Sequence, residues 1–450
     1  MMNDSNALKT DLYELTMAAG YFQNNLKLRA VFELYCHTLP PCRSFLIACG
    51  LERIVEYLLN LRFSDKDIEF LRAQSVFGLV SPRFFEYLKN FQFTGNLWAL
   101  PEGEICFAGE PILQVEAPII EAQILETYLL SIINISTLVA TKAARVVLAA
   151  QSDGGNRTAV DFGSRRAHGP QAGILAARSS YIGGCLGTSN VFAGRQFQIP
   201  IFGTMAHSFV EAFPTEKEAF EKYQAVFPAN TILLIDTYDT LKGVKKAIQL
   251  GKEMKGVRID SGNLRILSQK VRGILDRHNL GQVKIVASGN LNEYKIWDLV
   301  KTHAPIDVFG VGTDMVVSRD VPALDLTYKL VQTQDIQGTI SYKAKLSQGK
   351  HTVPGRKQVF RFFDKREKMI KDRIGLFTER PPANSLPLLK PILKEGRPCS
   401  SMPSLEKIRQ KVQDGLASIP KKFKDILRVH KYPVEYSSQI LHLKDRIKKV

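Results

Sequence analysis

The middle of the chain alternates short, continuous apolar runs with longer stretches of helical periodicity, and this alternation constrains the fold more than any other feature. Runs of Val, Ile and Leu without polar alternation are typical of parallel strands that are covered on both faces. The pattern therefore predicts an α/β fold, either a barrel or a doubly wound sheet. The expected strands are 159–161, 200–204, 231–236, 256–260, 284–288 and 305–310, and the expected helices are 172–181, 216–225, 241–253, 265–277 and 292–301.

The flanking regions mix helical and strand patterns. Helices are expected at 11–22 and 52–61, a strand at 31–35, and two short β runs within 104–117 that are separated by a tight turn at 108–111. A long helix is expected over about 121–150. With 450 residues and 45% hydrophobic content, the chain can form two or three domains.

Composition indicates a cytoplasmic protein that binds anions. The net charge of +17 attracts phosphorylated metabolites, nucleic acid or membrane surfaces, and charge alone does not choose among them. The basic segment 420–450, with its runs 421–424 and 446–449, is best explained as a solvated tail. No signal peptide or membrane span is expected. The cysteines lack zinc-type or disulfide-scaffold spacing, so reduced thiols are expected at Cys36, Cys42, Cys49, Cys106, Cys185 and Cys399.

Polar and small residues follow the expected strands. In a β/α barrel, catalytic groups lie where strands end and the next loops begin. A single carboxylate at such a point is often only a helix N-cap, but a histidine, several carboxylates and a glycine-rich turn at one pole predict an active site. These residues are Asp161, His207, Asp236, Asp260, Ser288, Gly310 and Gly312.

Two of these strand-end loops suit phosphate. Arg165 and Arg166 lie in a glycine-flanked loop and offer planar donor forks for phosphate or carboxylate oxygens; the alternative is a pair of surface arginines. The segment 309–314 has small residues that let backbone N–H groups approach a phosphate. It lacks the spacing of a Walker P-loop.

Three further candidates carry charge. Arg258 and Asp260 are two residues apart on one strand and therefore share a face, where they bind one ligand or form a buried ion pair. Asp236 and Asp239 could hold Mg²⁺ through water or bind ribose hydroxyls. His207 follows a strand and a small-residue turn, which places it near the carboxylates, although a lone histidine is more often structural.

The chain resembles the nicotinate phosphoribosyltransferase family in a series of strings that occur in the family's order over almost its whole length. Each string alone is weak, and together they are specific. They are TDLYELTM at 10–17, FGSRRAHGP at 162–170, GTMAHSF at 203–209, RIDSG at 258–262, ASGNL at 287–291, FGVGT at 309–313, TVPGRK at 352–357 and YPVE at 432–435.

The resemblance implies an irregular, TIM-like α/β barrel beside an α/β sandwich domain formed from both chain ends. The expected divisions are 1–125 for the first part of the sandwich, 126–335 for the barrel with the active site, and 336–450 for the rest of the sandwich and the basic tail. It also implies a homodimer with a shared active site. The implied reaction joins nicotinate to phosphoribosyl pyrophosphate with Mg²⁺, and ATP hydrolysis is coupled to it through a phosphohistidine.

The resemblance also assigns roles to residues. It makes His207 the phosphohistidine and places Arg258 and Asp260 at ligand-binding positions; we also expect Asp236 and Asp260 to be catalytic, with Asp236 orienting the His207 ring. Ser189 stands where nicotinamide-using relatives carry an acidic residue, so we expect it to favour the acid over the amide. The substrate-binding positions are Tyr13, which is implied to reach the neighbouring subunit's site, and Phe162, Arg165, Ser189, Arg258, Ser288, Gly289, Gly312 and Thr313.

Other functions remain open at this point. A sugar-phosphate aldolase of barrel type needs a Schiff-base lysine at a strand end, and the expected strand ends offer none. A nucleic-acid-binding protein would interleave basic residues with exposed aromatics; the C-terminal segment fits partly, but this function leaves the glycine-rich loops unexplained. Within the resemblance, nicotinamide and quinolinate are the alternative substrates.

Overall fold

The computed structural model describes residues 6–346 and 352–447 and divides into two compact units. The terminal unit comprises Met1–Thr137, Ala323–Phe423 and Val429–Val450, and the central unit comprises Leu138–Pro322 and Lys424–Arg428. The expected divisions at 125/126 and 335/336 therefore lie within the terminal unit's ranges. Residues 1–5 of the polar N-terminus and 448–450 of the basic tail lie outside the described residues.

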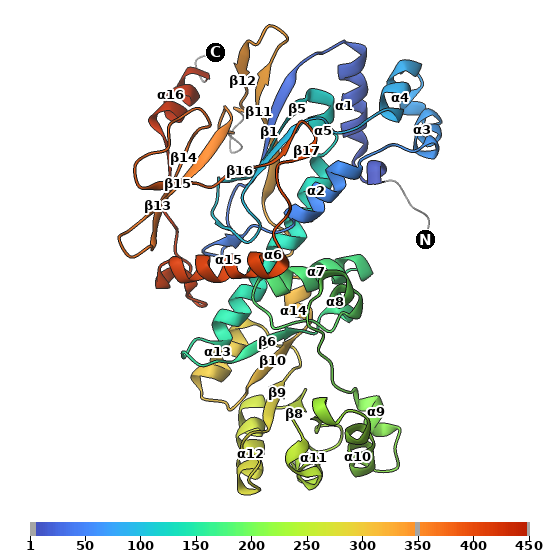
Figure 1. Ribbon diagram of the computed structural model, residues 1–450, viewed down its shortest axis with the longest axis vertical. Coiled ribbons are helices and arrows are strands. Elements are labelled where there is room, and N and C mark those ends of the chain that lie inside the picture. Colours follow the sequence, from blue (N-terminus) through green and yellow to red (C-terminus); the bar gives the residue numbers. More distant parts are fainter. Residues whose placement is uncertain (1–5, 347–351, 448–450) are drawn as a thin grey trace. The chain divides into compact units, whose positions relative to one another are not determined.

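The central unit is built on a parallel sheet with the strand order β6-β10-β9-β8-β7 (Figure 1). Most of its strand residues are buried, as expected for parallel strands covered on both faces. The α/β prediction is confirmed. The strands are β6 (Thr158–Asp161), β7 (Ile232–Leu234), β8 (Gly256–Ile259), β9 (Lys284–Ala287) and β10 (Val308–Val311), and the helices that match expectation are α7 (Pro170–Ile182), α10 (Glu216–Val226), α11 (Thr240–Ala247), α12 (Leu264–Arg277) and α13 (Glu293–Lys301).

Beyond β6 the sheet continues only as single-residue bridges. Asp161 pairs with Thr188, and Thr188 pairs with Ile201, both in parallel. The strand expected at 200–204 is reduced to this one bridge. Among the described residues no pairing joins the Ile201 segment to β7, so the ring of strands is not closed. The α/β class holds, and closure into a barrel is not confirmed.

The terminal unit contains a seven-stranded sheet, a four-stranded sheet and a two-stranded ribbon, to which both ends of the chain contribute. The strand orders are β12-β11-β1-β5-β3-β16-β17, β15-β13-β14-β18 and β2-β4. The bounds are β1 (Arg29–Cys36), β2 (Leu46–Ile47), β3 (Asn96–Ala99), β4 (Ile105–Cys106), β5 (Pro111–Pro118), β11 (Leu326–Gln334), β12 (Ile340–Tyr342), β13 (Lys357–Phe363), β14 (Met369–Leu376), β15 (Ser385–Pro387), β16 (Lys390–Lys394), β17 (Arg397–Pro398) and β18 (Val434–Tyr436).

The N-terminal segment TDLYELTM, at 10–17, links two helices of the terminal unit. Helix α1 (Leu12–Gln23) contacts the start of α6 (Glu126–Ala150) through polar side chains. The Thr127 backbone N–H donates to Glu14 over 3.0 Å, and the Thr127 hydroxyl donates to Asp11 over 2.8 Å. The Tyr13 hydroxyl donates to Glu126. The other helices of this unit are α2 (Leu51–Asn60), α3 (Asp65–Arg72), α4 (Pro82–Lys89), α5 (Ile119–Gln123), α15 (Leu405–Ser418) and α16 (Ser438–Ile447).

A buried ionic cluster lies in the terminal unit around Arg361, and we call it the Arg361 cluster. The Arg361 guanidinium binds Asp372 over 2.7 Å, Glu104 over 2.6 Å and the Ile105 carbonyl over 2.8 Å. Burial, together with the nearby charge of Asp372, raises the pKa of Glu110 well above its usual value. Lys411 adds a second cation to the cluster, because its Nζ lies 2.8 Å from Glu104.

One helical stretch, Ile119–Ala150, is long and apolar enough to cross a membrane by length and composition. Buried core helices of soluble proteins pass the same test, and 56% of its most apolar window is buried inside the protein. Two cations of this stretch are fully paired in the central unit: Lys142 lies 2.6 Å from Glu293 and 2.8 Å from Asp320, and Arg145 lies 3.1 Å from Glu293. Burial and these ion pairs explain the helix as part of the protein interior.

Candidate active site at the strand ends of the central unit

A network of three side chains joins the ends of β8 and β9. Arg258 donates from Nη2 to Asp260 over 2.6 Å and from Nε to the Ser288 hydroxyl over 2.8 Å. The Ser288 hydroxyl in turn donates to the same Asp260 oxygen. Arg and Asp lie two residues apart on one strand and therefore share a face, and the parallel neighbour brings Ser288 beside them. The expected grouping of these three residues is present.

Nη1 of Arg258 fixes the loop that leads to His207. Nη1 donates to the Thr204 hydroxyl over 3.0 Å and to the Met205 carbonyl over 3.3 Å. The guanidinium carbon lies 5.7 Å from the centre of the Phe162 ring, within cation–π distance. Phe162, which we predicted to bind substrate, lies at the end of β6 and packs against the Arg258 guanidinium.

Ionisation of Asp260 is favoured. Burial alone would raise its pKa, but hydrogen bonds from Ser288 and Arg258 and the positive charge of Arg258 outweigh burial and hold the pKa below its usual value. His207 lowers the pKa further through its charge. Asp260 is consequently a carboxylate at neutral pH, and 26% of its side chain is exposed to a ligand.

Glycines permit the close packing of the strand ends. Gly289 has a φ of +92°, and a Cβ there would lie 1.9 Å from the Asp260 carbonyl oxygen. A Cβ on Gly310 would lie 2.5 Å from the Phe162 ring. Any other residue at these two positions would displace Asp260 or Phe162. The Gly289 backbone therefore lies against Asp260 in the candidate site, where we predicted that Gly289 binds substrate.

Asp236 joins the network through hydrogen bonds from Asp260 and Ser261. Its Oδ2 accepts from the Asp260 backbone N–H over 2.9 Å and from the Ser261 hydroxyl over 2.7 Å. Its Oδ1 is buried and has no hydrogen-bond partner among the described residues. A buried carboxylate oxygen without a partner is costly, so this atom is a suitable point for a bound cation or its water.

Asp239, the second carboxylate considered for Mg²⁺, has a structural role. It is the N-cap of α11 and accepts from the Lys242 backbone N–H over 2.7 Å. Across residues 6–346 and 352–447, no group of three or more His, Cys, Asp or Glu side chains could hold a metal ion. The donor set therefore fits a cation held by one carboxylate, water and substrate oxygens, as Mg²⁺ commonly is.

His207 lies at the start of α9 (His207–Glu211), and its orientation differs from the expectation. Its Nδ1 lies 3.1 Å from the Thr237 hydroxyl. Asp236, which we expected to orient this ring, instead accepts from Asp260 and Ser261. The expectation failed because Asp236 is turned toward the β8 end, whereas Thr237, the next residue, faces the histidine.

Ser189 lies in a turn that a buried carboxylate fixes. Asp161 accepts from the Thr188 hydroxyl over 2.7 Å and from the Gly163 backbone N–H over 2.8 Å, while the Ser189 N–H donates to the Asp161 carbonyl. Burial raises the pKa of Asp161, and the hydrogen bonds from Thr188 and Gly163 offset only part of this. The half-buried Ser189 is therefore held at the end of β6.

The other predicted residues are less tightly held. Arg165 is exposed in the single turn Ser164–Arg166, and its guanidinium forms no hydrogen bond within residues 6–346 and 352–447. Gly312 and Thr313 lie directly after β10, where Thr313 begins the short helix α14 (Thr313–Val316). Tyr13 lies in the terminal unit on α1 with 44% of the residue exposed, and nothing in the central unit's network involves it.

Two hydroxyl residues of the site were missed from the sequence. Thr204 and Thr237 hold Arg258 and His207, respectively. Thr204 lies in the GTMAHSF string and Thr237 directly follows a strand-end aspartate, so their positions carried a signal. Threonines are common beside strands, however, and only the geometry distinguishes these two.

Comparison with known proteins decides the family. Three family models match the chain: the nicotinate phosphoribosyltransferase N-terminal domain over residues 8–134, the nicotinate phosphoribosyltransferase family over 158–361, and the nicotinate phosphoribosyltransferase C-terminal domain over 384–444. The chain belongs to the nicotinate phosphoribosyltransferase family. It is an enzyme of that family, a transferase of NAD biosynthesis, as the resemblance implied.

Relatives extend over nearly the whole chain. A nicotinate phosphoribosyltransferase of Mycobacterium tuberculosis is 44% identical over 97% of this chain and 92% of its own length, and that of Bacillus subtilis is 38% identical over 97% and 94%. The crystal structure of human nicotinic acid phosphoribosyltransferase superposes with a TM-score of 0.84 at 28% identity, covering 97% of this chain and 99% of the human one. A nicotinate-nucleotide pyrophosphorylase from Pyrococcus furiosus gives a TM-score of 0.75 at 26% identity, covering 93% and 97%. The nicotinate phosphoribosyltransferase fold thus covers both units.

Proposed function

We propose that this enzyme transfers the phosphoribosyl group of phosphoribosyl pyrophosphate to nicotinate and releases nicotinate mononucleotide and pyrophosphate. Family membership and the names of the relatives support these substrates. The observation that carries the proposal is the Arg258–Asp260–Ser288 network at the strand ends, where a cation, an ionised carboxylate and a hydroxyl are joined while the side chains of Arg258 and Asp260 stay 14% and 26% exposed. Both substrates are anionic, which suits the chain's charge of +17.

The chain's residues act by positioning and by charge. A positive charge develops at ribose C1 as the C1–oxygen bond to pyrophosphate breaks and the pyridine nitrogen forms the new bond. Asp260, ionised and partly exposed, is suited to accept hydrogen bonds from ribose hydroxyls, and Arg258 to bind an anionic group. The protein supplies no nucleophile for this step, so preorganised charge and alignment account for catalysis.

Mg²⁺ is part of the proposal. The unpartnered Oδ1 of Asp236 is the atom that would hold it, through water. When bound, Mg²⁺ neutralises charge on the departing pyrophosphate. Asp236 also holds the Asp260 backbone N–H, so one side chain would fix both the cation's position and that of the neighbouring carboxylate.

ATP coupling is proposed to run through His207. Its Nδ1 is held by Thr237, and Nε2 has no hydrogen bond to any of the residues that the structure describes. Nε2 is therefore the atom placed to attack the γ-phosphorus of ATP; the phosphorus–oxygen bond to ADP breaks, and water later releases the phosphate from the histidine. Orientation of one ring nitrogen by a partner is the usual way to prepare the other.

Product analysis tests the reaction. The enzyme is incubated with phosphoribosyl pyrophosphate, Mg²⁺ and, in separate samples, nicotinate, nicotinamide or quinolinate, and the nucleotides are separated by chromatography. We expect nicotinate mononucleotide as the dominant product. A preference for either of the other pyridines would overturn the substrate assignment.

A single substitution tests the histidine. His207→Ala should abolish substrate-stimulated ATP hydrolysis, while slow synthesis without ATP should persist because the chemistry at ribose C1 does not use this side chain. The exposed His303, which lies two residues beyond the end of α13, provides the matched control as His303→Ala. Equal incorporation of radiolabelled phosphate into the His207→Ala and wild-type enzymes would refute the assignment.

The proposal includes a homodimer with a shared site to which Tyr13 contributes. The exposed ring of Tyr13, whose hydroxyl is fixed by Glu126, is prepared to stack on a pyridine. Stacking contributes about 0.5–1.5 kcal/mol beyond buried area, so Tyr13→Ala should raise the nicotinate KM by up to about tenfold. A fully active monomer at micromolar concentration by light scattering would contradict the dimer.

A further inference from the structure

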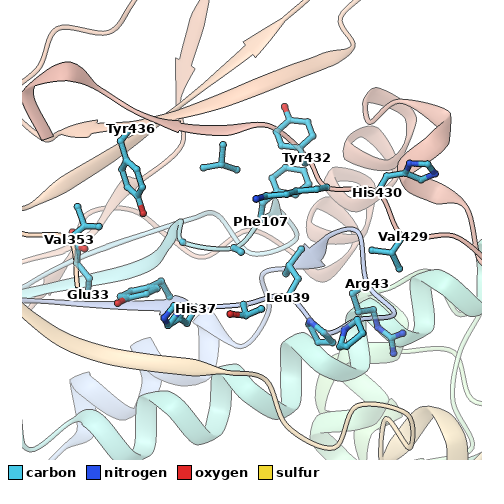
Figure 2. Close-up of a pocket in the computed structure, with 18 of the residues that line it drawn as sticks. Glu33, His37, Leu39, Arg43, Phe107, Val353, Val429, His430, Tyr432 and Tyr436 are labelled. Atoms are coloured by element: carbon cyan, nitrogen blue, oxygen red, sulfur yellow. The ribbon is translucent and has the colours of Figure 1, made fainter. Parts of the chain in front are cut away.

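A cavity of about 580 Å³ lies within the terminal unit, and no residue of the strand-end network lines it. Its walls come from β1, the loop that follows β1, the turn between β4 and β5, the start of β13 and the C-terminal segment that ends in β18. Figure 2 shows Tyr436, Phe107 and Tyr432 above this space and His37 and Leu39 below it. The volume falls in the range of about 300–1,000 Å³ of small-molecule sites.

One wall of the cavity is supported by two stacked aromatic rings. The rings of Phe107 and Tyr432 stack with centroids 3.8 Å apart and an angle of 7° between their planes. Both rings are tied to the Arg361 cluster, since the Arg361 guanidinium lies 5.6 Å from the Phe107 centroid and the Tyr432 hydroxyl lies 3.4 Å from Asp372. Phe107 and Tyr432 are only 2% and 3% exposed, so little of either ring is open to a ligand and the pair instead holds this wall in place before any ligand binds.

The polar groups of the cavity favour an anion. Glu33 is the only carboxylate in the lining, and it is neutralised by Lys357, whose Nζ lies 2.5 Å away. His37, His430 and the exposed Lys431 add positive or ionisable nitrogen groups. The Tyr436 hydroxyl, which points toward the space in Figure 2, has no recorded hydrogen bond within the described ranges and can donate to a ligand. The lining has no carboxylate free to bind a cation.

We propose that this cavity binds a planar aromatic anion of about mononucleotide size, with its ring against the half-buried Tyr436 and its anionic group toward His37 and Lys431. A metal ion is disfavoured because Glu33, the carboxylate in the lining, is already paired with Lys357. This ligand site is separate from the proposed reaction and does not depend on it. The shared chemistry, a flat ring with an attached negative group, has two sources: a nucleotide or an aromatic carboxylate.

Calorimetric titration of the full-length enzyme tests the site with two probes, adenosine monophosphate and 1-naphthoate. Ala108 lines the cavity in the β4–β5 turn, and Ala108→Trp fills the space with a large ring. Whichever probe binds the wild-type enzyme should bind the Ala108→Trp enzyme at least tenfold more weakly. Ala73→Trp places the same side chain at an exposed position after α3 and should bind the probe as the wild-type enzyme does.

A charge variant tests the anionic group without filling the cavity. Lys431→Glu should weaken binding severalfold at low salt, and the difference should shrink as salt is added, because Lys431 is exposed. Lys407→Glu, on the exposed surface of α15, is the matched control. Thermal unfolding of each variant shows whether it is folded.

The probes separate the outcomes. Binding of adenosine monophosphate that Ala108→Trp removes identifies a nucleotide site, and binding of 1-naphthoate alone identifies an aromatic carboxylate site. Heat from neither probe at millimolar concentration, or equal binding to the wild-type and Ala108→Trp enzymes, would overturn the proposal. Synthesis of nicotinate mononucleotide, measured on the same preparations, fails or succeeds independently, because Ala108 lies outside the central unit's network.

Discussion

Two arginines, Arg361 in the terminal unit and Arg258 in the central unit, have similar partners but different surroundings. Each contacts an aspartate, a backbone carbonyl and a phenylalanine ring. The side chains of Arg361 and Asp372 are completely buried, whereas those of Arg258 and Asp260 are 14% and 26% exposed. Arg361 binds only fixed protein groups, while the Arg258 network is open to solvent.

This difference in burial distinguishes a cluster that stabilises the fold from a network that can bind a ligand. In the Arg361 cluster the carboxylates of Asp372 and Glu104 pair with the buried Arg361, so removal of this cation leaves buried charge uncompensated. In the strand-end network the unpartnered Oδ1 of Asp236 and the exposed part of Asp260 keep binding capacity for a ligand. Charged residues therefore mark a reaction site here only where they remain accessible.

The largest predicted effect is on stability. Arg361→Met should lower the free energy of unfolding of the terminal unit by about 3–5 kcal/mol, because Asp372 and Glu104 lose their buried cation. The chain has two tryptophans, Trp98 in the terminal unit and Trp297 in the central unit. Urea titration in a Trp297→Phe background follows the terminal unit through Trp98.

The control for Arg361 is an exposed ion pair on the same sheet. Lys371 lies 2.9 Å from Glu435 and both side chains are partly exposed, so Lys371→Met should change the free energy of unfolding by no more than about 1 kcal/mol. If the two variants unfold at the same urea concentration, burial does not distinguish the two ion pairs.

The second effect concerns substrate choice. Ser189→Asp would place a carboxylate near that of nicotinate, and two such charges about 4 Å apart repel by up to about 4 kcal/mol at an effective dielectric constant of about 20. Nicotinate kcat/KM should fall at least tenfold while nicotinamide is unchanged or improved. Equal losses on both pyridines would show that Ser189 serves only the turn, and an unchanged nicotinate value would dismiss the role altogether.

A smaller effect is expected at Thr237, a positioning residue for His207. Thr237→Val removes one hydrogen bond, worth about 0.5–1.5 kcal/mol, so phosphate transfer from ATP to the enzyme should slow by about two- to twelvefold. Thr237→Ser should restore the rate because it keeps the hydroxyl. Identical labelling rates in all three enzymes would show that the 3.1 Å contact has no influence on the histidine.

The smallest effect is a difference in pH dependence. Burial raises the pKa of Asp161 in the folded state, so the folded enzyme binds the proton more tightly than the unfolded chain, and stability falls as pH rises above the ordinary value of 3.8. Asp161→Asn should remove this loss of stability at higher pH, as measured by unfolding of the central unit through Trp297. Asp260→Asn should act with the opposite sign below pH 3.8, because the pKa of Asp260 is lowered. Parallel pH profiles for both variants would contradict the assignment.

Much of the central unit could be predicted because its strands and helices are short, local patterns. The strand ends at Asp236, Asp260 and Ser288 follow from buried apolar runs, and parallel strands bring such ends to one edge. Barrel closure could not be predicted in the same way, because the segment around Ile201 forms only one bridge. Pairing of distant segments depends on packing that no local pattern records.

The details of the site required the structure. Asp236 and Thr237 are adjacent, and only side-chain direction decides which of them faces His207. Asp239 has the same residue type as Asp236 but caps a helix. The Arg361 cluster and the cavity beside it join residues from both ends of the chain, so no spacing in the sequence indicated either one.

The most direct measurement compares turnover with stability for Arg258→Met. In a Trp98→Phe background, Trp297 reports unfolding of the central unit while nicotinate mononucleotide synthesis is measured on the same preparation. The account predicts that kcat/KM falls by about 10²–10³, the usual cost of one preorganised charge or donor, while the loss in unfolding free energy is smaller than that of Arg361→Met in the terminal unit. Near-normal kcat/KM together with a large loss of stability would make Arg258 a structural cation like Arg361 and would contradict the strand-end site.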